Sequence, residues 1–190
     1  MRRKRVTLDA EAFTATRDLV RAELAGDLSR GGYVLRASEE RTRQQRYFDK
    51  FLVLSRPGLL TRAARLLADI VSDDCERLAV NGAPATALGT ALAQETGMPL
   101  LLSDDEQPGT FGGELFAGTR VALVEDVVFT GRRALAGIAA LRSVGAEPLE
   151  VLCLLDRQSG AAQLLAGEGV SLRPLFTEAE LLDQPGHPPS

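Results

Sequence analysis

The sequence predicts an α/β fold: a mainly parallel twisted sheet flanked by helices, with a small N-terminal hood element. The main observation is that short apolar runs typical of strands alternate with longer segments of helical spacing. A length of 190 residues and a hydrophobic content of 45% fit one domain with one substantial core. We expect an N-terminal helix and hood strands over 7–55, a core over 56–182 and a loose tail over 183–190.

The N-terminal part is predicted to contain one helix and two strands. Apolar residues at helical spacing indicate an amphipathic helix over 7–25, which we expect Gly26 and Gly31-Gly32 to break. A short strand is predicted at 33–35, and a second from 47 through 54, separated by a polar stretch. These two strands would form the hood.

The core is predicted to repeat a strand-then-helix pattern. Pro57 and Gly58 mark the start of a helix whose apolar residues recur at helical spacing up to Val71. The elements expected after it are a strand at 78–80, a helix at 85–95, a strand at 100–102, a loop at 103–119, a strand at 121–124, a helix at 133–144, a strand at 151–155, a short helix at 159–166 and a strand at 172–176. Right-handed crossovers would place the carboxyl ends of the strands along one edge, where ligands bind.

The basic residues exclude several kinds of chemistry. Of 22 lysines and arginines only Lys4 and Lys50 are lysines, and the sole histidine, His187, lies in a proline-rich tail. This excludes Ser-His-Asp and Cys-His hydrolases and histidine-based metal sites. The chain also lacks the GxxxxGK[ST] pattern of Walker-type phosphate loops. The chemistry therefore has to use carboxylates, arginines, hydroxyls and backbone amides.

Charge and cysteine usage limit the partners and the compartment. The net charge is −4, and without the four basic residues at 2–5 the balance is 18 − 26 = −8, so we expect no nucleic-acid partner. Cys75 and Cys153 lack CxxC spacing and are predicted to be buried thiols of a reducing cytoplasm. No apolar run is long enough to cross a membrane, so we expect a cytoplasmic protein without a membrane partner.

The most informative segment is RVALVEDVVFTGRRALAGIAAL, from Arg120 to Leu141. An apolar strand is followed by Glu125 and Asp126, and Thr130-Gly131 then open a loop into a helix. Two carboxylates at a strand end can accept hydrogen bonds from ribose hydroxyls, while amides at a helix N-terminus can bind a phosphate. The alternative is that the acids only favour the helix dipole, which does not explain their distance from the loop glycine.

The stretch VALVEDVVFTG resembles the phosphoribosyl pyrophosphate (PRPP) signature of type I phosphoribosyltransferases. Three more stretches resemble the orotate phosphoribosyltransferases among them: GGYVLRAS, RYFDKF and LLDRQSGAAQLLAGEGVSLRPLFTEAEL. The resemblance runs in the family's order from about residue 10 to residue 182. It implies a type I phosphoribosyltransferase fold whose core, 56–182, binds PRPP.

The resemblance implies transfer of ribose 5-phosphate from PRPP to orotate, a step of pyrimidine nucleotide biosynthesis. It implies a homodimer, and Mg²⁺ bound mainly through PRPP, with the direct protein ligands unknown. Glu125 and Asp126 would be the catalytic pair that holds the ribose hydroxyls. The other implied site residues are Thr130, Gly131, Arg132 and Arg133 for the 5'-phosphate, and Arg36, Phe48, Phe129 and Arg157 for the base.

Three of the base-site residues also have a structural interpretation. Phe48 could be a core side chain. Arg157 could form a surface ion pair with Asp156, and Arg36 could be a solvated surface residue. The sequence leaves both interpretations open for each of them.

The chain departs from the family in its lid, residues 103–114. The family's lid carries lysines, an arginine and a histidine, whereas this lid has none of them and includes Asp104-Asp105-Glu106. These acids would repel PRPP and its products. The loop at 80–84 keeps its glycine and proline but lacks an acidic residue often found in this region.

Two further departures affect the pocket itself. Phe129 stands where the family usually has a threonine, so its ring could stack on a different base or block the pocket. Arg132 stands at a position of small residues, where it could bind the phosphate or plug its site. Two alternatives therefore remain: a non-catalytic PRPP- or nucleotide-binding regulatory protein, and a phosphoribosyltransferase for another base.

Overall fold

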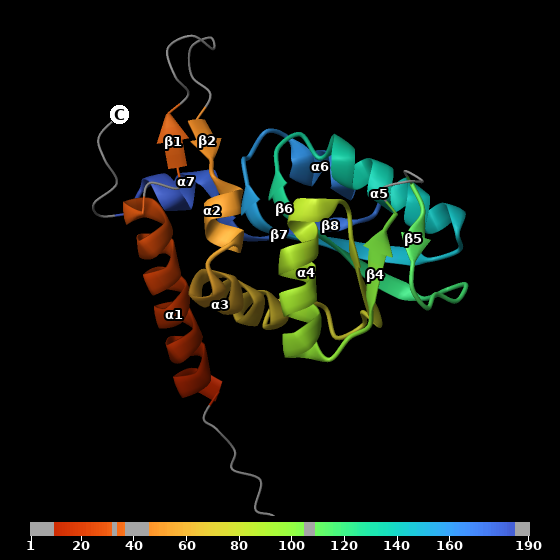
Figure 1. The fold of residues 1–190 in the computed structure, drawn as a ribbon, viewed down its shortest axis with the longest axis horizontal. Helices are drawn as coiled ribbons and strands as arrows, with labels where there is room; N and C mark the ends of the chain where they lie inside the picture. The colour runs from red at the N-terminus through yellow and green to blue at the C-terminus, as the bar shows by residue number, and fades with distance from the viewer. Residues whose placement is uncertain (1–9, 32–33, 37–45, 105–108, 185–190) are drawn as a thin grey trace, which may run out of the picture.

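The predicted α/β class is confirmed by a computed structural model, which describes residues 10–31, 34–36, 46–104 and 109–184. Its main sheet has six strands in the order β5-β4-β3-β6-β7-β8, parallel except for β5 (Figure 1). The strands are β3 (Arg77–Val80), β4 (Leu100–Ser103), β5 (Phe111–Gly112), β6 (Arg120–Val128), β7 (Glu147–Asp156) and β8 (Ser171–Thr177).

Helices cover both faces of this sheet and form two apolar cores. The larger core packs the sheet against α1 (Ala10–Arg30), α2 (Lys50–Leu54), α3 (Pro57–Ala68), α4 (Ala83–Thr96) and α7 (Glu178–Leu182). The smaller core packs the other face against α5 (Arg132–Ser143) and α6 (Ala161–Ala166). Within the described ranges, no helix has the length and apolar character needed to cross a membrane.

Strand β6 lies at the centre of the sheet and contributes side chains to both cores in turn. Val121 and Leu123 belong to the smaller core, whereas Ala122 and Val124 belong to the larger one. This alternation is the normal two-residue period of a strand. It directs the next two residues, Glu125 and Asp126, toward α5 and toward α2 and α4 respectively.

The strand order reverses next to β3, at the carboxyl edge of the sheet. Strand β3 lies between β4 and β6, so the crossover after β3 runs to one side and the later crossovers run to the other. In open parallel sheets such a reversal of strand order is where ligands bind. The residues that follow β3 and those at the end of β6 therefore meet at the predicted binding edge.

The hood is a two-stranded antiparallel sheet of β1 (Val34–Arg36) and β2 (Arg46–Phe48). The prediction that Gly26 ends the first helix was wrong, because α1 continues to Arg30. Leu24, Ala25 and Leu28 are buried in the larger core. This packing outweighs the cost of about 1 kcal/mol for a glycine inside a helix.

The prediction that the second strand continues to residue 54 was also wrong, because residues 50–54 form α2. Asp49 caps this helix, its carboxylate accepting a hydrogen bond from the amide of Leu52 at 3.1 Å. Val53 and Leu54 are buried, while Phe51 and Leu52 are exposed. A short apolar run fits a strand or a helix equally well, so periodicity alone misassigned it.

Two short elements were not predicted. Strand β5 lies within the segment expected to be a loop, and α7 follows β8 directly. Helix α7 begins with a capping box, in which Thr177 and Glu180 bond each other's backbone amides. The sequence TEAE carries this signal, so α7 could have been predicted.

Close packing of α4 on β3 gives a stability prediction. A Cβ atom at Gly89 would overlap Cγ1 of Val80, so Gly89→Ala should lower the free energy of unfolding by about 1–3 kcal/mol. Gly58→Ala is the matched control, since a Cβ atom there meets nothing within 4 Å. It should be neutral or slightly stabilising in the same urea titration. Equal stabilities of the two variants would contradict this account of the α4–β3 contact.

Candidate functional site

The acid pair lies inside β6 rather than beyond its end. The strand was expected to stop at residue 124, but it pairs with β7 as far as Val128. Glu125 and Asp126 are therefore part of the sheet, with side chains 2% and 1% exposed. Buried carboxylates need compensating partners, and each of the two has its own.

Glu125 is bonded on the α5 side of the sheet. Its Oε1 accepts a hydrogen bond from Asn81 Nδ2 at 3.2 Å, and its Oε2 lies 3.6 Å from Arg133 Nε. Asn81 also donates to the backbone carbonyl of Arg133 at 3.1 Å, and Arg133 Nη2 donates to the backbone carbonyl of Asn81. These contacts tie the loop after β3 to the first turn of α5.

Asp126 is compensated from the opposite side of the sheet. Its Oδ2 lies 2.5 Å from the ammonium nitrogen of Lys50, the first residue of α2. This oxygen is buried and accepts no directional hydrogen bond from the described residues, so its compensating interaction is the ion pair with Lys50. Lys50 is 22% exposed, and therefore more exposed than the carboxylate that it pairs with.

Burial raises the pKa of Glu125 to about 7. Arg133, Asn81 and Lys50 oppose the shift, because they favour the ionised form, while the charge of Asp126 adds to it. A carboxyl with a pKa in this range changes its protonation near neutral pH. Such perturbed groups in a crevice are typical of functional sites.

The predicted phosphate loop connects β6 to α5. Gly131 is the N-cap of α5 with φ of +79°, and it supplies no side-chain cap to the first-turn amides. A Cβ atom at this position would lie 3.1 Å from Cβ of Ala161 in α6, so glycine is favoured by both the backbone angle and the packing. Thr130 and Arg132 are exposed at the mouth of this loop.

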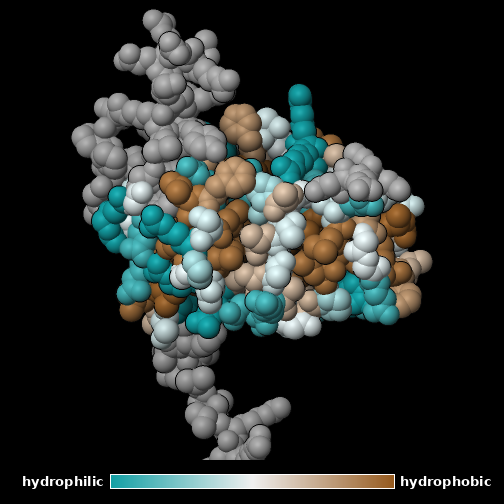
Figure 2. Space-filling view, in the orientation of Figure 1, coloured by the Kyte–Doolittle hydropathy of each residue, from teal (hydrophilic) through white to brown (hydrophobic). Residues whose placement is uncertain are grey.

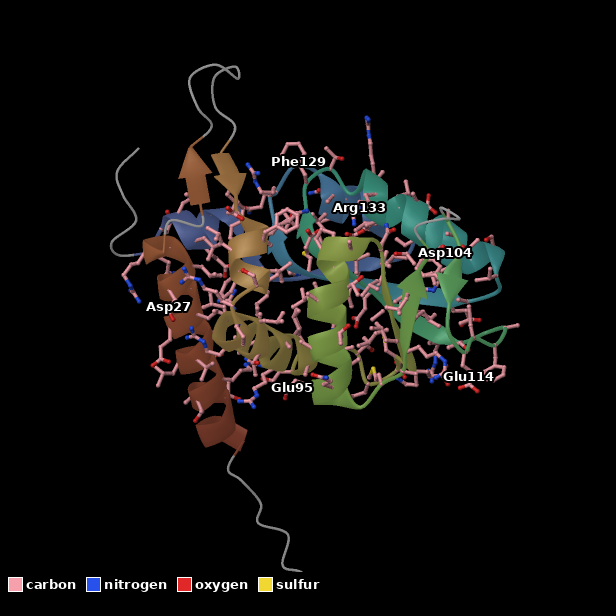
Figure 3. The ribbon with its side chains drawn as sticks, viewed as in Figure 1. Asp27, Glu95, Asp104, Glu114, Phe129 and Arg133 are labelled. Carbon is pink, nitrogen blue, oxygen red and sulfur yellow. The ribbon has the colours of Figure 1, made fainter. Side chains whose placement is uncertain are left out.

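Three strand ends bring together a second group of side chains. Phe129 follows β6 and is 47% exposed, and the guanidinium of Arg157, after β7, lies 5.5 Å from its ring centroid. Arg157 Nε donates to Glu178, the first residue of α7, at 3.0 Å. Arg157 therefore pairs with Glu178 rather than with Asp156, the partner that the sequence suggested. Figure 3 shows Phe129 and Arg133 at the carboxyl edge of the sheet, with Glu95 and Glu114 at the opposite edge.

The other two base-site candidates come from the hood. Phe48 is 4% exposed and belongs to the larger core, which favours its packing interpretation over direct contact with a base. Arg36 ends β1, and its side chain lies outside the described residues. The roles of both residues in base binding remain predictions.

The lid joins β4 to β5 in antiparallel pairing. The amide of Asp104 donates to the carbonyl of Thr110 at 3.1 Å, which closes the base of the acidic segment. Ser103 Oγ accepts a hydrogen bond from the amide of Gly82 at 2.9 Å. The start of the lid is thereby attached to the loop at 80–84, next to Asn81. Residues 105–108 lie outside the described residues.

Sequence reasoning missed three contributors to this edge of the sheet: Lys50, Asn81 and Glu178. Asn81 could have been found, because it directly follows a predicted strand that neighbours the motif strand. Lys50 and Glu178 carry no local signal for their partners. They could be found only from the tertiary fold.

The donor set fits a divalent cation carried in by a phosphate ligand. Among the described residues no three His, Cys, Asp or Glu side chains gather closely enough to hold a metal on their own. Mg²⁺ is usually bound by one or two carboxylates together with substrate phosphates. Glu125 and Asp126 lie on opposite sides of the sheet, so either one alone could supply the protein carboxylate.

A parallel sheet with an acid pair at its strand-order reversal, followed by a loop in which Gly131 starts α5, is the arrangement expected of type I phosphoribosyltransferases. No family model matches the chain. Among curated sequences, the chain is 34% identical to the orotate phosphoribosyltransferase of Nocardioides sp. over 170 residues, 84% of this chain and 93% of that protein. It is also 34% identical to the one from Halobacterium salinarum over 186 residues, 90% and 99% of the two chains. The chain belongs to the orotate phosphoribosyltransferase family.

Solved structures agree with this assignment. The orotate phosphoribosyltransferase of Aeropyrum pernix superposes with a TM-score of 0.73 at 28% identity, covering 84% of this chain and 97% of that one. The Mycobacterium tuberculosis enzyme in complex with PRPP gives a TM-score of 0.70 at 27% identity, covering 85% and 98%. The resemblance identified from the sequence is thus confirmed for family and fold.

The raised pKa of Glu125 predicts a pH-dependent stability. Because the pKa is about 7 in the folded chain, against 4.5 for an ordinary glutamate, this stabilisation is present below pH 4.5 and is lost as the pH rises through 7. The melting temperature of the wild type relative to Glu125→Gln should therefore fall from pH 5 to pH 8, by the equivalent of up to about 3 kcal/mol. Glu95→Gln removes the same charge from the opposite edge and is the control. A difference that does not change with pH would refute the raised pKa.

Proposed function

We propose that this chain is an active orotate phosphoribosyltransferase, transferring ribose 5-phosphate from PRPP to orotate to form orotidine 5'-monophosphate and pyrophosphate. The observation that carries the proposal is the acid pair of β6, placed at the strand-order reversal and beside the uncapped N-terminus of α5. Names of relatives alone would not distinguish an active from an inactive member. This arrangement retains the groups that the ribose phosphate needs.

The reaction breaks the bond between C1' and the diphosphate oxygen, and the diphosphate leaves with the electron pair of that bond. A bond forms between C1' and a ring nitrogen of orotate, which gives up its proton to the departing diphosphate or to water. The first-turn amides of α5, with Thr130 and Arg132, would hold the 5'-phosphate. The ribose would then lie over the acid pair, whose negative charge favours the positive charge that develops on the sugar ring. The departing diphosphate, which lies at the other end of the ribose from the 5'-phosphate, needs cations nearby.

Orotate would be recognised by the group formed by Phe129, Arg157 and Glu178. A guanidinium binds a carboxylate through two parallel hydrogen bonds, and Glu178 holds Arg157 through Nε, which orients the terminal nitrogens. The half-exposed ring of Phe129 provides an apolar face against which a flat base can stack. Arg157 is therefore the residue that we assign to the carboxylate of orotate.

Three further features belong to the proposal. Mg²⁺ would enter with PRPP, and Glu125 and Asp126 would be its nearest carboxylates; bound there, it supplies positive charge to the phosphates. A homodimer is expected by analogy with the family. Cys75 and Cys153 are both free and buried, which supports the placement in a reducing cytoplasm.

The acidic lid favours a second candidate, a protein that binds PRPP or a nucleotide without turnover. Its sequence offers no cation to the departing diphosphate. Phe129 favours a third, a transferase for another base. Binding measured by calorimetry together with turnover measured over a panel of pyrimidine and purine bases separates the three.

The proposal predicts turnover that depends on the acid pair. With orotate, PRPP and Mg²⁺, the wild type should release pyrophosphate at a rate at least about 100-fold above that of Glu125→Ala/Asp126→Ala, since charge stabilisation at a reaction centre is typically of that size. Pyrophosphate release in a coupled assay is the measurement. Turnover equal to that of the double variant would rule out catalysis, and binding of PRPP under the same conditions would then favour the regulatory candidate.

The assignment of Arg157 predicts a specific kinetic defect. Arg157→Lys keeps the charge but loses the planar fork, so the KM for orotate should rise about 10-fold or more while the KM for PRPP changes little. Arg142→Lys, at an exposed ion pair with Glu168, is the matched control. Equal changes in both KM values would show that Arg157 does not act on the base.

A further inference from the structure

The ion pair between Lys50 and Asp126 places a cation where the proposed reaction lacks one. The lid carries no Lys, Arg or His, and apart from Lys4 in the N-terminal arm, Lys50 is the only lysine of the chain. Its ammonium lies 2.5 Å from Oδ2 of Asp126. Asp126 is 1% exposed and Lys50 is 22% exposed, so the cation lies closer to solvent than its carboxylate partner.

The alternation along β6 fixes the side on which this cation lies. Glu125 is directed toward α5 and is bonded by Asn81 and Arg133, whereas Asp126 is directed toward α2 and is paired by Lys50. The two acids therefore have separate counter-charges on opposite sides of the sheet. On the α2 side, the ammonium of Lys50 contacts Asp126, and the lysine side chain is the more exposed of the two.

The geometry of ribose 5-phosphate sets the direction of the diphosphate. C5' and C1' lie at opposite ends of the sugar, so a ligand with its phosphate at α5 and its hydroxyls over β6 directs C1' away from α5. That direction leads to α2 and to the start of α4. A cleft of about 560 Å³ lies between these two helices. Its lining consists of Asp49, Phe51, Leu52, Leu54, Ser55, Ala83, Pro84 and Ala87.

The two residues next to Lys50 in the sequence, Asp49 and Phe51, both line this cleft. Figure 2 shows apolar atoms exposed over α2, where Phe51 and Leu52 lie. Apolar walls lower the local dielectric constant and so strengthen the attraction between an ammonium and a phosphate. The cleft is large enough for a diphosphate group. Among the described residues its lining contains one charged residue, Asp49, whose carboxylate caps α2, and the ammonium of Lys50 lies 5.6 Å from the ring centroid of Phe51 in the same lining.

We propose that Lys50, held in place by Asp126, binds the diphosphate of PRPP and takes over the charge role that the acidic lid cannot perform. The inference rests on the proposed function, since it assigns a residue to one end of the same substrate. It gives Asp126 a second task, which is to orient a cation. The cation then belongs to α2 rather than to the lid.

Two ligands that differ only in the diphosphate test this inference directly. Calorimetric titrations with PRPP and with ribose 5-phosphate, both with Mg²⁺, compare wild type, Lys50→Met, Lys50→Arg and the control Arg65→Met. Arg65 pairs with Glu95 at the opposite edge of the sheet, so its replacement removes an equal charge away from the site. Lys50→Met should weaken PRPP binding about 10-fold or more and ribose 5-phosphate binding less than about 3-fold. Lys50→Arg should recover most of the loss, and Arg65→Met should change neither affinity.

Removing Lys50 alone leaves a buried carboxylate unpaired and could unfold the chain. The double variant Lys50→Met/Asp126→Asn removes both charges and avoids this, so the comparison is repeated in that background, with Asp126→Asn alone as its reference. The double variant should bind PRPP more weakly than Asp126→Asn, with little difference for ribose 5-phosphate.

The possible failures are distinguishable. Equal losses for the two ligands, or no loss for either, would overturn the assignment of Lys50 while leaving the proposed function standing. A wild type that binds neither ligand would overturn the proposed function itself. If Lys50→Met selectively loses affinity for PRPP but the wild type shows no turnover, the role of Lys50 in binding is supported and only catalysis is overturned.

Discussion

Two consecutive carboxylates buried in the central strand impose the constraint on which the rest of the site depends. A strand directs neighbouring side chains to opposite faces, so Glu125 and Asp126 make their direct contacts with different elements. A buried charge without a partner costs several kcal/mol, and each acid therefore requires a cation or donor from a different element. Asn81 and Arg133 meet this requirement on one face, and Lys50 meets it on the other.

This constraint reaches well beyond the two acids. Arg133 approaches the loop after β3 so closely that a Cβ atom at Gly82 would lie 2.5 Å from its Nη2. Gly82 also has φ of +93°, so both the backbone angle and the approach of Arg133 favour glycine. On the other face, the cap supplied by Asp49 starts α2 at Lys50, whose ammonium contacts Asp126. The glycine at position 82 and the Asp49 cap are far apart in the sequence, but both belong to the contacts that compensate the charges of Glu125 and Asp126.

The sequence was sufficient for the features that depend on local pattern. Alternating strands and helices predicted the sheet, and the motif at Glu125 and Asp126 predicted which edge carries the site. The failures have a common cause in tertiary packing: burial of Leu28 carries α1 past Gly26, and burial of Val53 and Leu54 turns an apolar run into a helix. Lys50 and Glu178 were missed because the residues that they bond are distant in sequence. The sequence predicts where the acids are, but only the fold identifies what compensates them.

The position of Lys50 also changes how the acidic lid is interpreted. A cation on a lid acts only when the lid closes, whereas a cation held by a buried carboxylate keeps its position whatever the lid does. A site that has its cation on α2 does not need lysines in the lid. An acidic lid then opposes only those phosphate groups that it directly covers. The absence of cations from the lid and the ion pair between Lys50 and Asp126 are therefore interpreted together. The absence of Lys, Arg and His from the lid argues against catalysis when the lid is considered alone. It is consistent with catalysis when Lys50 is included.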